Sequence, residues 1–88
     1  MKRPKMVSGP TPYLPPEAIA NRVTGVAILV CTITEHGTVE DCGIVQSLPY
    51  TDIALVETLQ AQTYTPVLLA NKPVRVRYTF KINFQASH

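Results

Sequence analysis

The sequence predicts an α+β domain: a three-stranded antiparallel sheet with two helices on one face, in the order α-β-β-α-β. Residues 74–84 alternate apolar and polar side chains without interruption, which indicates a strand with one buried face. Residues 23–34 are dense in β-branched side chains and contain no proline, and residues 39–46 return after a glycine. Two short segments, 16–22 and 52–62, carry helix-start signals and supply the two helices.

Length and composition restrict the class of protein. The 88 residues, 45% of them hydrophobic, fit a single domain with a thin core. The net charge is +2, and the basic residues are divided between the N-terminal tip and residues 72–81, so the concentrated basic patch of a nucleic-acid binder is missing. No apolar run is long enough to span a bilayer, and residues 1–22 do not form a secretory signal. We therefore expect no nucleic-acid contact and no membrane contact by this chain, with any export signal preceding residue 1 in a longer protein.

The beginning of the chain reads as a Pro-rich extended linker over residues 1–14. Five of the eight prolines fall within the first sixteen residues, and each fixes a backbone angle and removes a hydrogen-bond donor. Pro16 suits the first position of a helix that continues to Arg22. The folded domain is expected over residues 15–85, followed by a tail at residues 86–88.

The first two strands form a hairpin that encloses a cysteine pair. Ile33 and Val39 should share the inner face of the sheet, whereas Cys42 differs in parity from Val39. A β-bulge at residues 40–41 resolves this conflict and leaves Cys31 near Cys42 on the core side. The pair then forms either a disulfide that staples the thin core or two buried thiols that act as small hydrophobes. Two cysteines and two distant histidines are too few for a zinc site, so we expect no metal and no cofactor.

The second helix and the last strand follow. Thr51 is placed to cap a helix over residues 52–62, in which Leu55 and Leu59 lie one turn apart on the same face. Residues 71–73, Asn-Lys-Pro, form the turn into the last strand. In that strand, Val74, Val76, Tyr78, Phe80, Ile82 and Phe84 alternate with Arg75, Arg77, Thr79, Lys81 and Asn83.

Catalytic chemistry has no recognisable basis in the sequence. The carboxylates near the hairpin turn lie on a flexible tip without the enclosed cavity that acid–base catalysis needs. No serine has a histidine and an acidic residue at a spacing that indicates a hydrolase triad. The sequence also contains no phosphate-binding glycine loop. We predict that the protein is not an enzyme.

An ordered set of short segments carries a family resemblance: Arg22-Val-Thr-Gly25, Gly37-Thr-Val39, Tyr64-Thr-Pro66 and Asn71-Lys-Pro-Val74. In this order and spacing, over about residues 12–84, they resemble the C-terminal domain of TonB, the bacterial energy-transducing protein. The family's Gln-Pro-x-Tyr-Pro segment before the first helix is altered here to Thr11-Pro-Tyr-Leu-Pro15, and its usual aromatic before Tyr64 is replaced by Gln62. These departures indicate a relative adapted to another partner.

A narrower resemblance concerns the cysteine-containing hairpin. Cys31-Thr-Ile-Thr, Gly37-x-Val39-x-x-Cys42, Leu48-Pro49 and Tyr64-Thr-Pro-Val67 are similar to TonB-like domains of myxobacterial envelope proteins, gliding-motility machinery included. The resemblance as a whole implies a periplasmic interaction domain of a protein anchored in the inner membrane, serving energy transduction, protein transport or motility. An oxidising periplasm in turn favours the disulfide over the free thiols.

The resemblance also implies where a partner binds. In TonB-like domains an extended segment of an outer-membrane or periplasmic protein adds beside the last strand, at the edge of the sheet. The implied docking edge consists of Val74, Arg75, Val76, Arg77, Tyr78, Thr79 and Lys81, with Thr11, Pro12, Tyr13 and Leu14 near the bound peptide. The basic residues of this edge either favour an acidic segment or solvate an exposed face.

The outer face of the first strand is unexpectedly apolar. Val26, Ile28 and Val30 have the parity opposite to the core residues, where a sheet covered on one side normally carries polar side chains. Coverage by a homodimer partner, another protein or the Pro-rich segment is favoured over ordinary β-propensity in a central strand. Self-association of a structural domain through this face is therefore the alternative function.

Overall fold

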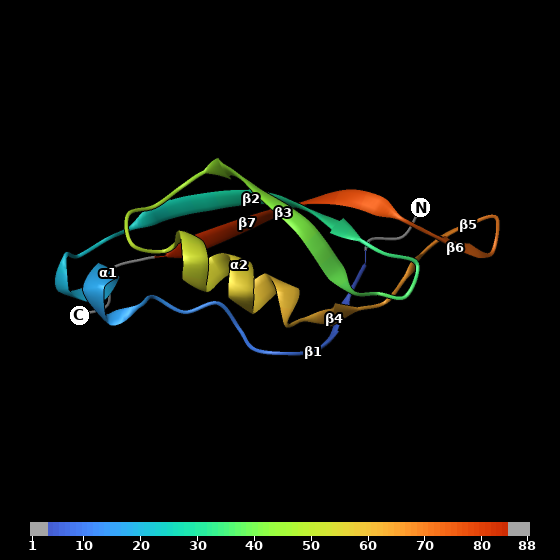
Figure 1. Ribbon diagram of the computed structural model, residues 1–88, viewed down its shortest axis with the longest axis horizontal. Helices are drawn as coiled ribbons and strands as arrows, with labels where there is room; N and C mark the ends of the chain where they lie inside the picture. Colours follow the sequence, from blue (N-terminus) through green and yellow to red (C-terminus); the bar gives the residue numbers. More distant parts are fainter. Residues whose placement is uncertain (1–3, 85–88) are drawn as a thin grey trace.

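The computed structural model describes residues 4–84 and contains a three-stranded antiparallel sheet in the order β3-β2-β7. The central strand β2 (Gly25–Ile33) lies between β3 (Val39–Gln46) and β7 (Val76–Phe84). The helix α2 (Asp52–Gln60) packs beneath this sheet, and α1 (Pro16–Ala20) lies on the same side at one end (Figure 1). The predicted α+β class and the order α-β-β-α-β are confirmed for these main elements. The predicted tail at residues 86–88 lies outside the described residues.

Four further strands, all short, were not expected from the sequence: β1 (Met6–Ser8), β4 (Thr63–Tyr64), β5 (Val67–Leu69) and β6 (Lys72–Val74). The β5–β6 pair is a hairpin whose two turn residues, Ala70 and Asn71, both have left-handed backbone angles. Such a two-residue turn matches the twist of the strands it joins. The predicted last strand is therefore divided at Arg75, because Val74 pairs with Val67 in the hairpin instead of continuing β7.

The β2–β3 hairpin contains the predicted bulge. Val30 pairs with Gly43 and Thr32 pairs with Glu40, so β3 has one more residue than β2 between these pairs. Asp41 occupies the bulge with a φ of 50°. A second register shift lies between the pairs Leu29–Ile44 and Ile28–Gln46. Val45 falls between these pairs in β3 and is 66% exposed. The edge strand β3 is therefore irregular at two positions.

The core lies between α2 and the inner face of the sheet. Leu55 and Leu59 of α2 are buried, as the helical spacing predicts, and they pack with Leu29 and Ile33 of β2. Burying one such leucine contributes about 2 kcal/mol. Thr51 begins the helix but does not cap it with its side chain, because its hydroxyl donates to the carbonyl of Leu48 instead (2.8 Å).

The N-terminal segment is extended and is held against the folded elements. β1 pairs with β4, and Thr65 exchanges two hydrogen bonds with the backbone of Lys5. Gln62, buried to 3% exposure, donates its amide to the carbonyl of Pro10 (2.8 Å). Figure 1 shows the segment running along α2, on the side of the helix away from the sheet.

Candidate partner-binding surfaces

The free edge of β7 is the most regular unpaired strand edge in the structure. β7 pairs with β2 at nine consecutive positions, from Val76 opposite Ile33 to Phe84 opposite Gly25, with no register shift. Within residues 4–84 no strand pairs with its other side. An edge strand presents unpaired backbone N–H and C=O groups, so this side of β7 can accept another extended chain.

The opposite edge of the sheet is less suited to accept a strand. The two irregularities of β3, at Asp41 and near Val45, interrupt the backbone spacing that a regular ladder requires. Bulges of this kind are one means by which proteins protect a sheet edge from pairing. The two edges of one sheet therefore differ, and β7 is the one with uninterrupted backbone spacing.

The inner side of β7 is fixed by aromatic packing. Tyr78 and Phe80 meet edge to face with ring centroids 5.1 Å apart, and Tyr64 lies 5.6 Å from Phe80. The hydroxyl of Tyr64 donates to the side-chain carbonyl of Gln62. Burial, with a smaller contribution from Tyr78, raises the pKa of Tyr64 above its ordinary value of 10.0. Gln62 thus joins β4 to the N-terminal segment, a role that its position in the sequence did not reveal.

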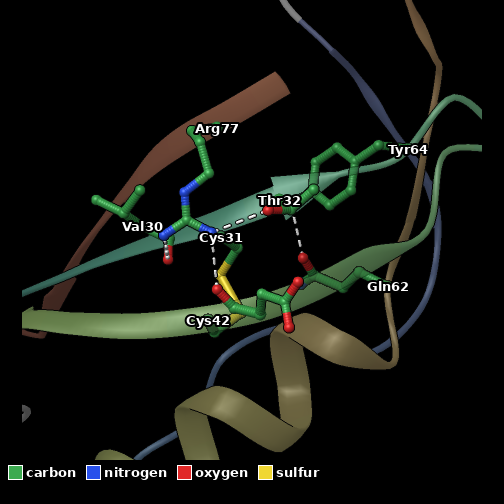
Figure 2. Close-up of a disulfide and its surroundings, with 8 residues drawn as sticks. Val30, Cys31, Thr32, Cys42, Gln62, Tyr64 and Arg77 are labelled. Carbon is green, nitrogen blue, oxygen red and sulfur yellow. Dashed lines mark hydrogen bonds between the residues drawn. A yellow bond between two sulfur atoms is a disulfide. The ribbon is translucent and has the colours of Figure 1, made fainter. Parts of the chain in front are cut away.

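The three basic residues of the implied docking edge have different surroundings. Arg75, between β6 and β7, lies 4.0 Å from Glu35 and 3.9 Å from Glu40. The guanidinium of Arg77 crosses the outer face of β2 and donates to the hydroxyl of Thr32 and to two backbone carbonyls, those of residues 30 and 41, at 2.9–3.3 Å (Figure 2). Lys81 is exposed and forms no ion pair within residues 4–84. Of the three, Lys81 is the cation that an added acidic segment could reach without displacing a contact.

A disulfide joins Cys31 of β2 to Cys42 of β3, which confirms the favoured state of the pair. The two Cα atoms are 4.0 Å apart, and the link lies beside the bulge at Asp41, where Figure 2 shows it beneath the guanidinium of Arg77. Cys31 is fully buried in the core. The disulfide and the Arg77 hydrogen bonds therefore hold the same irregular stretch of β3 from the two faces of the sheet.

The residues from Thr11 to Leu14 lie apart from β7. They belong to the segment that runs along α2, so the helix lies between them and the sheet (Figure 1). Pro12 and Leu14 are half-buried there, whereas Tyr13 is 55% exposed. The structure therefore divides the residues of the implied partner site into two sets, one on the edge of β7 and one beside α2.

Comparison with protein families identifies the fold. The family model for the Gram-negative bacterial TonB protein C-terminal region matches residues 10–86. The chain belongs to the TonB C-terminal family. A search of curated proteins gave no significant match. Domains of the TonB C-terminal family are periplasmic protein-interaction domains of envelope energy transduction, and the family is not one of enzymes.

The outer face of β2 in this TonB C-terminal domain is partly covered by its own side chains. Val26, Ile28 and Val30 are half-buried and lie opposite Asn83, Lys81 and Thr79 of β7. The Gln46 side chain donates to the carbonyl of Val26. The N-terminal segment is on the other side of the molecule, so it does not cover this face within the described residues (Figure 1). Self-association through this face stays a prediction.

Within residues 4–84, no three acidic, histidine or cysteine side chains are grouped so that they could hold a metal ion. Neither of the two described helices has the length and apolar character needed to cross a bilayer.

Proposed function

We propose that this domain binds an extended segment of a partner protein by strand addition at the free edge of β7. The observation that carries the proposal is the contrast between the two sheet edges: β7 is regular over nine residues, whereas β3 is bulged twice. In strand addition the main-chain hydrogen bonds supply affinity, and pockets for alternate side chains supply selectivity.

The docking edge is formed by Val76, Arg77, Tyr78, Thr79 and Lys81. All five lie in β7, and Tyr78 also packs edge to face against Phe80 of the same strand. Val74 and Arg75 precede the strand, so a partner reaches them only where it extends beyond the end of β7. Thr11, Pro12, Tyr13 and Leu14 contact a partner that continues around the molecule onto α2.

The biological role that fits this binding mode is mechanical coupling. The parent protein is anchored in the inner membrane, and the domain recruits an outer-membrane or periplasmic component for energy transduction or gliding motility. Support comes from membership of the TonB C-terminal family together with the altered Pro-rich segment before α1, which indicates a partner other than that of TonB.

Binding of short peptides followed by backbone NMR tests the site. Peptides selected from a random library against the oxidised, ¹⁵N-labelled domain are titrated while amide shifts are recorded. We expect the largest shifts at residues 76–84 and in the paired residues of β2, because new hydrogen bonds form along β7. Binders whose shifts are confined to β3 or to the outer face of β2 would contradict strand addition at β7.

A further inference from the structure

An open groove of about 480 Å³ lies between α2 and the segment that leads into α1. One wall comes from Tyr13, Pro15 and Glu17, and the other comes from α2 and the residue before its cap: Tyr50, Asp52, Ile53, Ala54 and Glu57. None of these residues belongs to β7 or to the outer face of the sheet. The groove is therefore a surface separate from the proposed docking edge.

The groove exposes apolar and aromatic side chains that the core does not use. Tyr13 is 55% exposed, Tyr50 is 56% exposed and Ile53 is 75% exposed. Ile53 lies one helical turn before Glu57, on the face of α2 that is turned away from the buried Leu55 and Leu59. Ile53 therefore contributes little to the folded core and is available to a molecule that enters the groove.

The charge of the groove has one sign. Three of the six acidic residues of the chain, Glu17, Asp52 and Glu57, line it, whereas none of the eight basic residues does, although the chain has a net charge of +2. The carboxylate ion pairs within residues 4–84 involve Glu35 and Glu40 and none of these three.

The helix dipoles explain only part of this arrangement. Glu17 and Asp52 lie in the first turns of their helices, where a carboxylate is favoured by the positive end of the dipole. Glu57 lies in the second half of α2, where that effect no longer applies. The dipole therefore does not account for Glu57, which lines the groove together with the exposed Tyr13 and Tyr50.

We propose that this groove binds a basic segment of a partner protein, with a lysine or arginine side chain held beside Tyr13 and Tyr50. A cation is attracted to the face of a tyrosine ring, and the aliphatic stem of a long basic side chain can cover an apolar neighbour such as Ile53. The carboxylate of Glu57 pairs with the charged end. An acidic segment is repelled by the same three carboxylates, so charge selects the occupant.

Two matched peptides test the proposal at low ionic strength. The probe is an acetylated and amidated peptide of alternating lysine and serine, and the matched peptides carry glutamate or norleucine in place of lysine. We expect the lysine peptide to shift the amides of Tyr13, Ile53 and Glu57, with weaker binding as salt is added, because an exposed charge contact is screened. The glutamate and norleucine peptides should leave these amides unchanged.

Variants locate the interaction. Glu57→Gln and Tyr13→Ala should each weaken binding of the lysine peptide by about 2–5-fold, the size of one exposed charge or cation–aromatic contact. Glu40→Gln removes the same charge from β3, away from the groove, and should leave the affinity unchanged. Equal weakening by Glu40→Gln would show only diffuse attraction to the protein and would overturn the proposal.

The outcomes separate this groove from the β7 edge. A lysine peptide that shifts no groove amide, or a glutamate peptide that shifts the same amides, overturns the groove and leaves strand addition at β7 standing. Groove amides that shift with protein concentration alone would identify a second copy of this chain as the occupant, which also overturns the proposal. Peptides that bind β7 should keep their affinity in the Glu57→Gln variant, whether or not the groove is a site.

Discussion

Gly37 lies where the β2–β3 hairpin meets β4. Its φ of 83° is a left-handed conformation, and its carbonyl accepts a hydrogen bond from the backbone of Tyr64 (2.8 Å). A Cβ atom at this position would lie 2.0 Å from the carbonyl oxygen of Tyr64. Glycine is therefore required both by the turn and by the close approach of a second backbone.

Replacement of Gly37 should be far more costly than replacement of another glycine in the same hairpin. Gly37→Ala should lower the free energy of unfolding by at least ~2 kcal/mol, because backbone strain is added to the steric conflict. Gly43→Ala is the control: its Cβ would meet no atom closer than 4.0 Å, so a change within ~0.5 kcal/mol is expected. Urea unfolding of both variants measures the difference, and equal losses would contradict this view of the turn.

The raised pKa of Tyr64 gives stability a dependence on alkaline pH. Burial, followed by the effect of Tyr78, raises the pKa above 10.0, so the folded state favours the protonated phenol more than the unfolded state does. The stabilisation is therefore complete below pH 10.0 and declines as the pH rises through that value and beyond. Tyr64→Phe should be less stable at neutral pH, because it lacks the hydrogen bond to Gln62, but should lose less stability between neutral and alkaline pH.

Urea unfolding at several pH values measures this dependence. Tyr13→Phe changes an exposed tyrosine and serves as the control. In this control, the free energy of unfolding should decline with rising pH as steeply as in the original protein. If Tyr64→Phe also keeps that slope, the loss of stability above pH 10.0 comes from other groups.

At the scale of elements, the disulfide cross-links β2 to β3 in addition to the hairpin turn that joins them, and it spans 11 residues of sequence. Reduction should lower the free energy of unfolding by about 2–4 kcal/mol, because the unfolded chain regains the freedom that the link removes. This is a large share of the stability of so small a domain. Urea unfolding with and without reductant measures the effect.

The double variant Cys31→Ala, Cys42→Ala controls for other effects of reductant, since its stability should not respond. Thiol titration of the unreduced, unfolded protein should find no free cysteine. Two titratable thiols would contradict both the disulfide and its contribution to stability.

The main elements could be predicted because each leaves a periodic or compositional signal. The alternation over residues 74–84 predicted the last strand, of which β7 forms all but the first two residues, and the spacing of Leu55 and Leu59 identified the buried face of α2. Even the bulge at Asp41 could be predicted from the sequence, because Val39 and Cys42 could not otherwise share one face of the sheet. Here local pattern and tertiary structure agree.

The short strands and the long-range contacts left no such signal. A strand of two or three residues, such as β4 or β5, is too short to show a period, and its pairing depends on distant segments. Gln62 reaches Pro10 across 52 positions, and Arg77 reaches Val30 across 47. Ile44 has the same parity as the inward-facing Cys42, yet it is 41% exposed, because β3 changes register directly after it. The groove beside α2 arises from tertiary placement alone.

The whole molecule is elongated, with extents of 47 × 22 × 18 Å, and β7 runs along its length (Figure 1). A peptide paired with β7 would lie along the same direction. Tension applied along the peptide would then load its backbone hydrogen bonds together instead of one after another. This geometry suits a coupling that transmits force. A basic segment of the same partner, held in the groove beside α2, would add a second attachment, and two linked attachments bind with higher overall affinity than either one alone.

Backbone methylation of a peptide that binds β7 tests strand addition most directly. In an added strand, alternate residues direct their N–H groups toward the edge, so only one parity of N–H groups is needed. Two versions of the peptide, N-methylated at odd or at even positions, are compared by calorimetric titration with the unmodified peptide. The structure predicts that one version loses at least ~10-fold in affinity, the effect of roughly one or two lost hydrogen bonds, while the other binds nearly as before. Equal affinity for both versions and the unmodified peptide would contradict strand addition at β7.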